Sequence, residues 1–123
     1  MCHFGVKETS VEFEKRRARK IFDEQLTEEY NFIIEKTREL AIKATSREDL
    51  WEIHSYLTNA LKNINRKYDY RYSLIINLFG ELLSEGRISE RDLAVFSVDK
   101  VEQIRYIANF IKRKDTEEKS KQE

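Results

Sequence analysis

Proline is absent from this chain of 123 residues, and glycine occurs only three times. Because these two residues interrupt helices and form tight turns, their scarcity leaves few places where a helix would have to stop. Turn pairs such as asparagine–glycine, which connect the strands of hairpins, are also missing. The sequence therefore predicts an all-α protein.

Cysteine is almost absent, and the charges are balanced. The single cysteine, Cys2, cannot form an internal disulfide, which fits a reducing cytoplasm. Lys plus Arg equals Asp plus Glu at 23 each, which argues against a dedicated nucleic-acid-binding protein. No apolar run approaches the length of a membrane span, and residues 1–10 lack the apolar core of a signal peptide. We expect a cytoplasmic protein without membrane insertion.

The length favours one domain. We expect residues 1–8 to be disordered, residues 9–112 to form a single helical domain and residues 113–123 to be a disordered charged tail. Charged residues make up 37% of the chain, which leaves modest apolar material. Such a chain forms long helices with one apolar stripe, or completes its core by pairing with a copy of itself.

Three capping-box patterns mark helix starts. Thr9 with Glu12 opens a helix to about Ala44, and Thr45 with Glu48 opens the next. Because no proline or glycine interrupts the apolar spacing that follows, we expect one long helix over residues 47–83, followed by a glycine cap at Gly86.

The third capping box, Ser89 with Asp92, predicts a short helix to about Val95, and Ser97 starts a last helix that reaches about Phe110. Gly80, inside the long helix, costs roughly 1 kcal/mol relative to alanine. These elements predict a long helical stalk and a compact head of short helices.

Residues suited to catalysis or metal binding are few. The two histidines are His3, near the N-terminus, and His54, which has no second histidine or cysteine nearby. Because a metal site needs three or four closely spaced ligands, we expect neither a metal site nor a hydrolytic centre. The basic stretch at residues 15–20 could contact phosphates, but its i,i+4 spacing to acidic residues favours a solvated helix face.

Trp51 and His54 lie on one side of the expected helix. At roughly 100° per residue, His54 falls close to Leu50 and Leu61, while Trp51 lies at the flank of this apolar arc. A flanking tryptophan is typical of an interface. The alternative is that Trp51 covers the core and His54 is a border residue.

The run KYDYRYS, at residues 67–73, places three tyrosines at alternate positions. In a continuous helix Tyr68 and Tyr72 share a face, while Tyr70 points almost oppositely. Aromatic groups on both sides predict contacts on both sides, with the head on one and a second subunit or client on the other. Packing within one monomer is the alternative.

These residues also carry a resemblance. EDLWEIHSYL at residues 48–57, KYDYRYSLIINLFGELLSEG at residues 67–86 and VDKVEQI at residues 98–104 resemble the fluorescence recovery protein family of cyanobacterial photoprotection. The resemblance covers about residues 22–112. It implies an all-α homodimer without cofactor or enzymatic activity.

Members of that family bind the photoactivated orange carotenoid protein, chiefly at its C-terminal domain. They accelerate its return to the resting orange form and help to detach it from the phycobilisome, so that quenched fluorescence recovers. The resemblance thus implies the same partner, or a related carotenoid protein, for this chain.

The resemblance also implies a functional patch that contains Trp51 and His54. This chain departs from the family pattern at two further positions, where Ser55 replaces an acidic residue and Leu61 replaces an arginine. Together with the tyrosine run, the residues predicted for partner binding or the dimer interface are Trp51, His54, Ser55, Leu61, Tyr68, Asp69, Tyr70, Arg71 and Tyr72.

Three hypotheses remain open. The first is a regulator of a carotenoid protein, and the second is a dimeric scaffold that has changed its client. The third is a helical protein that binds nucleic acid through residues 15–20. Salt-dependent DNA binding would favour the third, and faster recovery of the orange form would favour the first.

Overall fold

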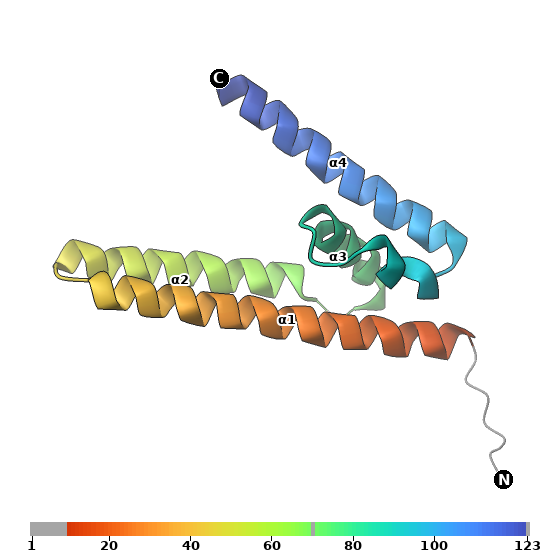
Figure 1. Ribbon diagram of the computed structural model, residues 1–123, viewed down its shortest axis with the longest axis horizontal. Helices are drawn as coiled ribbons and strands as arrows, with labels where there is room; N and C mark the ends of the chain where they lie inside the picture. The colour runs from red at the N-terminus through yellow and green to blue at the C-terminus, as the bar shows by residue number, and fades with distance from the viewer. Residues whose placement is uncertain (1–9, 70, 123) are drawn as a thin grey trace, which may run out of the picture. The chain divides into compact units, whose positions relative to one another are not determined.

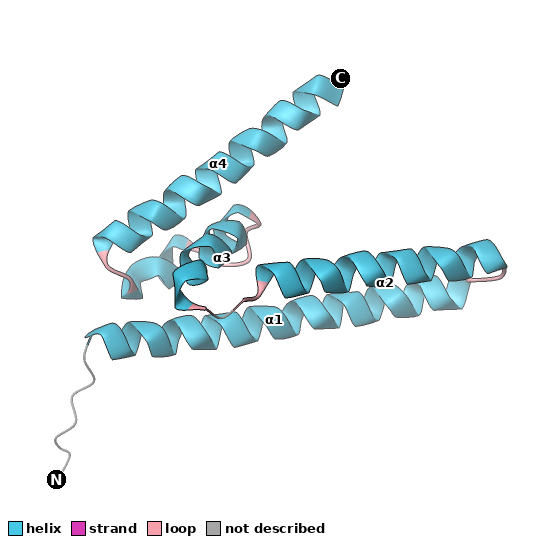
Figure 2. Cartoon of the chain, turned by 180° about the vertical axis from the view of Figure 1, so that it is seen from behind, coloured by secondary structure: helices cyan, strands magenta, loops and turns pink. Residues whose placement is uncertain are grey.

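The computed structural model describes residues 10–69 and 71–122, but not the side chains at 10, 72, 73 and 118–122. The elements are α1 (Ser10–Lys43), α2 (Arg47–Lys67), α3 (Tyr72–Ser84), the 3₁₀ helix η1 (Glu90–Val95) and α4 (Val98–Gln122) (Figures 1 and 2). The described residues contain no strand, so the all-α prediction is confirmed. None of their helices is both long and apolar enough to cross a membrane. The disorder predicted for residues 1–8 falls outside the described residues.

The chain divides into two compact units. The hairpin unit, Ile21–Asp69, contains most of α1 together with α2. The α3–α4 unit combines the first turns of α1, within Met1–Lys20, with everything from Tyr70 onward. The prediction of one domain with a stalk and a head remains a prediction.

In the hairpin unit, α1 and α2 run antiparallel and side by side (Figures 1 and 2). The N-cap of α2 is Ser46, whose side chain accepts a hydrogen bond from the Asp49 N–H at 3.1 Å. Asp49 Oδ2 in turn accepts from the N–H groups of Thr45 at 2.9 Å and Ser46 at 3.3 Å. The predicted capping box of Thr45 with Glu48 is therefore wrong by one residue, because Asp49 at the third helical position satisfies two backbone donors at once.

The predicted continuous helix over residues 47–83 is also wrong. α2 ends at Lys67, and Tyr68 has φ −98° and ψ 66°, outside the helical region. The end of α2 coincides with contacts to α1: Lys67 Nζ lies 2.9 Å from Glu29 Oε2, and the Tyr68 hydroxyl donates to the same oxygen. Since Tyr68 caps α2 and Tyr72 begins α3, the two do not share a helix face, as had been expected.

The α3–α4 unit has a compact apolar core. Its largest fully buried side chains are Ile75, Leu78, Phe79, Leu82, Leu93 and Ile104. Phe79 packs edge-on against Phe96 with ring centroids 5.1 Å apart. A Cβ at Gly80 would lie 2.4 Å from Ile107 Cγ2. Gly80 therefore allows the close approach of α3 and α4, a role that its helix propensity did not reveal.

Gly86 ends α3 as predicted. Its φ of +74° is the left-handed conformation that favours glycine. The Gly86 N–H donates to the Leu83 carbonyl at 3.1 Å, and the Arg87 N–H to the Leu82 carbonyl at 3.0 Å. This pair of bonds is a Schellman motif, which satisfies two carbonyls at the helix end.

The last two helices begin where the sequence predicts. Ser89 and Asp92 form the capping box of η1, and α4 starts directly after Ser97, whose hydroxyl accepts from the Lys100 N–H at 3.4 Å. However, α4 continues through residues 113–122, where the sequence predicts a charged tail, and the separation of this tail from the domain remains a prediction. The segment contains no glycine or proline and is rich in helix-forming residues.

Candidate interaction surface

One side of α2 exposes large apolar groups. Leu50 and Trp51 are each 65% exposed, and the Trp51 ring meets the exposed His54 ring edge-on at 5.5 Å. Leu61 is 41% exposed and lies on the same side by its spacing from His54. We call Leu50, Trp51, His54 and Leu61 the α2 patch. It contains no acidic or permanently charged side chain, so it is suited to a largely apolar contact.

Ser55 is exposed at the edge of the α2 patch. With Leu61 it makes this surface neutral at two positions where the family resemblance implies opposite charges. A neutral surface gains little from long-range attraction, but it avoids the desolvation penalty of a buried ion pair.

The neighbouring helix α1 exposes apolar groups too. Phe32 is 63% exposed and Ile42 is 84% exposed, and Tyr30 and Ile34 are also exposed. In the hairpin unit the buried residues are Ile21, Phe22, Gln25, Ile33, Ile64 and Lys67. A pair of helices cannot completely bury the apolar face of each helix, so much of the apolar surface of this unit stays in contact with solvent.

The C-terminal end of α2, unlike the exposed α2 patch, is largely buried against α1. Lys67 and Glu29 form an ion pair whose side chains are only 1% and 12% exposed. The Tyr68 ring packs edge-on against Phe22 at 5.4 Å, and Lys67 Nζ lies 5.6 Å from the centre of the Tyr68 ring. Tyr68 thus makes contacts within the monomer, the alternative that the sequence left open.

The predicted site residues do not form one cluster. Trp51 and Tyr68 are seventeen positions apart on α2, which is roughly 25 Å along the helix axis. Asp69 is half-buried and Arg71 is exposed at the N-cap of α3. Tyr70 lies outside the described residues, as does the side chain of Tyr72. The prediction of a contact surface at the tyrosine run therefore stays untested at those two positions.

No group of three or more histidine, cysteine, aspartate or glutamate side chains within the described ranges is placed to hold a metal ion. The polar contacts of this part of the chain include helix caps, ion pairs and hydrogen bonds from side chains such as Thr37 to the helix backbone. Of these, the cap of α2 lowers the pKa of Asp49, mainly because the Thr45 N–H donates to its carboxylate.

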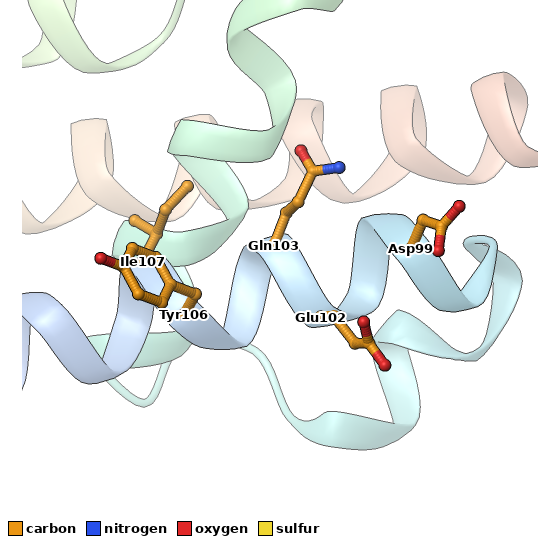
Figure 3. A pocket seen from close by; sticks show the side chains of 5 residues that line it. All are labelled: Asp99, Glu102, Gln103, Tyr106 and Ile107. Carbon is orange, nitrogen blue, oxygen red and sulfur yellow. The ribbon is translucent and has the colours of Figure 1, made fainter.

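The α3–α4 unit carries two surface hollows that the sequence reasoning missed. One, of about 570 Å³, is lined by Asp99, Glu102, Gln103, Tyr106 and Ile107 of α4 (Figure 3). The other, of about 370 Å³, lies between η1 and α4, and its lining includes Leu93, Phe96, Val98, Val101 and Glu102. The i,i+3,i+7 spacing of Asp99, Glu102 and Tyr106 was the available signal.

Comparison with known proteins identifies the family. The described part of the chain is all-helical and exposes large apolar side chains on α1 and α2. Residues 11–108 match the family model described as "Photoprotection regulator fluorescence recovery protein". The chain is 30% identical over 95 residues to the fluorescence recovery protein of Synechocystis sp. (strain PCC 6803), covering 77% of this chain and 87% of that protein. This chain therefore belongs to the fluorescence recovery protein family, whose members are photoprotection regulators.

Solved structures agree. The fluorescence recovery protein of Fremyella diplosiphon superimposes with a TM-score of 0.74 at 28% identity, covering 79% of this chain and 95% of that chain. The Synechocystis sp. PCC 6803 structure gives 0.73 at 30% identity, covering 78% and 94%. The resemblance stated from the sequence is thus confirmed.

Proposed function

We propose that this chain is a non-enzymatic, cytoplasmic regulator that binds the photoactivated orange carotenoid protein, or a related carotenoid protein, at its C-terminal domain. Binding accelerates the return of that partner to the resting orange form and ends fluorescence quenching at the phycobilisome. The observation that carries this proposal is the family match over residues 11–108. No cofactor is required, because the carotenoid belongs to the partner.

The mechanism we infer is a change of populations and barriers. A regulator that binds the intermediates of recovery more tightly than the activated form lowers the barrier between the two coloured states. It turns over only if it releases the resting form. This mechanism involves no covalent step, so a stable helical fold with contact surfaces is sufficient for it.

We further propose that the protein acts as a homodimer in which the hairpin unit supplies the stalk and the subunit interface. The support is the exposed apolar surface of α1 and α2, which includes the α2 patch. A tryptophan has roughly 150–250 Å² to bury, so covering the exposed 65% of Trp51 contributes about 3 kcal/mol per protomer. In this proposal the α3–α4 unit is the head that contacts the client.

The association state is measured by sedimentation of the full chain at micromolar concentration. The wild type is expected to sediment as a dimer and Trp51→Glu as a monomer, since the substitution places a charge in an apolar contact. Glu52→Gln is the matched control, because it changes the charge of the neighbouring exposed residue. A wild type that sediments only as a compact monomer would contradict the dimer.

A second candidate function is a dimeric scaffold with a different protein client. The departures at Ser55 and Leu61 favour it, because a neutral patch keeps the apolar contact while losing two charges that a carotenoid protein would recognise. Size-exclusion chromatography distinguishes the candidates. Co-elution with the photoactivated carotenoid protein, and not with its resting form, supports the regulator, whereas no co-elution with either form leaves the scaffold.

A further inference from the structure

The first half of α4 presents two carboxylates beside an exposed aromatic ring. Asp99, Glu102 and Tyr106 recur at i, i+3 and i+7, which places them along one side of the helix. Tyr106 is 72% exposed, and half-buried Ile107 lines the same hollow of about 570 Å³ (Figure 3). An exposed aromatic ring beside carboxylates is able to contact a cationic group through its face.

The negative charge at this surface is only partly compensated by the described residues around it. No hydrogen bond or salt bridge joins Asp99 or Glu102 to the described residues, but Glu102 does attract Arg105, whose pKa is raised mainly by its hydrogen bond to Glu90 and less by Glu102. The nearby cation Arg105 is held by Glu90, with Nε 2.9 Å and Nη2 2.8 Å from the same carboxylate oxygen. Lys100 is paired with the buried Glu14 of α1. A cationic partner would therefore meet two carboxylates that no described cation binds directly.

An apolar groove borders the same carboxylates. The hollow of about 370 Å³ between η1 and α4 is lined by Leu93 and Phe96 from one side and by Val98 and Val101 from the other. Val98 is 72% exposed, although it is a large apolar residue. Glu102 lines both hollows, so the charged and apolar parts form one continuous surface.

We propose that this surface, which we call the α4 acidic face, docks a basic segment of the client protein. An arginine of that segment lies over the Tyr106 ring and donates to Asp99 and Glu102, and a neighbouring apolar side chain enters the groove beside Val98. Arginine fits better than lysine because its planar guanidinium both stacks on an aromatic ring and forms several hydrogen bonds to carboxylates. The inference extends the proposed function by giving the chemistry of the client contact.

The test is a titration of the ¹⁵N-labelled full chain with a capped hexapeptide of alternating leucine and arginine. The amides of Asp99, Glu102 and Tyr106 are expected to shift together. D99N/E102Q, which keeps the side-chain shapes, is expected to weaken binding about tenfold, because charge-assisted hydrogen bonds are lost. Y106L is expected to weaken it about threefold through loss of the cation–π contact.

Two controls make the test specific. D115N/E117Q removes the same charge from exposed positions farther along α4 and is expected to bind the peptide as the wild type does. A peptide with glutamate in place of arginine is expected not to bind. Equal binding by D99N/E102Q and the wild type, or shifts centred on the acidic residues 23–28 instead, would overturn the proposal. So would dissociation of the dimer by D99N/E102Q, which would assign the surface to a second copy of the chain.

The docking proposal and the proposed function fail separately. If the peptide binds as expected but the carotenoid protein is not accelerated, the α4 acidic face stands and the client is a different protein. If D99N/E102Q accelerates recovery as well as the wild type does, the face is not the client site, although the function holds.

Discussion

The buried ion pair of Lys67 with Glu29 leads to a strong prediction: Glu29→Ala should lower the free energy of unfolding by about 3–5 kcal/mol. The Lys67 side chain is only 1% exposed, so its ammonium group cannot replace the lost partner with bulk water. The substitution also removes the acceptor of the Tyr68 hydroxyl. Since a domain is stable by roughly 5–15 kcal/mol, this loss is a large part of the total.

The loss of stability depends on which partner of the ion pair is removed. Lys67→Met alone leaves Glu29 with the Tyr68 hydroxyl as a donor, so it is expected to cost less than Glu29→Ala. The double variant Glu29→Leu with Lys67→Met replaces both charges by apolar groups of similar volume. Such replacements are often neutral or stabilising by about 1–4 kcal/mol. The double variant is therefore expected to be more stable than Glu29→Ala.

The free energies of unfolding of these variants are measured by urea unfolding, monitored by circular dichroism. All variants are compared at one fixed protein concentration, because association shifts the apparent stability. Glu35→Ala is the matched control, since Glu35 pairs with Arg38 at 2.7 Å on the exposed side of α1 and should cost less than about 1 kcal/mol. The account of the buried pair is refuted if Glu29→Ala costs no more stability than Glu35→Ala. It is also refuted if the double variant is no more stable than Glu29→Ala.

Three further predictions concern the backbone. Gly80→Ala should destabilise the protein by about 1–3 kcal/mol, although alanine has the better helix propensity, because its Cβ would lie 2.4 Å from Ile107 Cγ2. A thermal midpoint above that of the wild type would contradict this prediction. Gly86→Ala should cost about 1–2 kcal/mol at φ +74°, and Gly86→Asn less, as measured by urea midpoints; equal costs would argue against the left-handed cap. The lowered pKa of Asp49 means that its stabilisation is present above its unfolded pKa and is lost as pH falls through the lower folded value. Asp49→Asn should therefore reduce the acid-dependent change in the urea midpoint below about pH 4, and an unchanged acid profile would contradict that role.

Local signals were sufficient for much of the fold. The end of α1, the cap at Gly86, the capping box of η1 and the start of α4 each depend on residues within a few positions of one another. The start of α2 at residue 47 was predicted, but its capping box was misplaced by one residue, because Thr45 and Ser46 both fit the same pattern. The structure distinguishes them, since Ser46 has the extended conformation of an N-cap and accepts from the Asp49 N–H.

The end of α2 was not predictable in this way. Nothing between Lys67 and Tyr72 forbids a helix, and the contact found at the break is with Glu29, 38 positions away from Lys67. The same contact explains why Tyr68 packs inside the hairpin unit. The role of Gly80 was hidden for a similar reason, since Ile107 belongs to another helix.

For the candidate surfaces, too, local spacing predicted one part and contacts between distant residues determined the rest. Spacing alone placed Trp51 beside His54 on α2, and the structure finds their rings in contact. Exposure, however, depends on what the other elements cover, so the hollow beside Tyr106 emerged only from the fold. Which client occupies these surfaces depends on the partner's chemistry as well.

The most direct test of the proposed function is the dark recovery of a photoactivated orange carotenoid protein, followed by absorbance. One molecule of this chain per twenty of the carotenoid protein is expected to accelerate the return of the orange form, with the whole population recovering because the regulator is released and acts again. An unchanged recovery rate, tested even at equimolar amounts and across several carotenoid-protein variants, would contradict the assignment of this chain as their regulator.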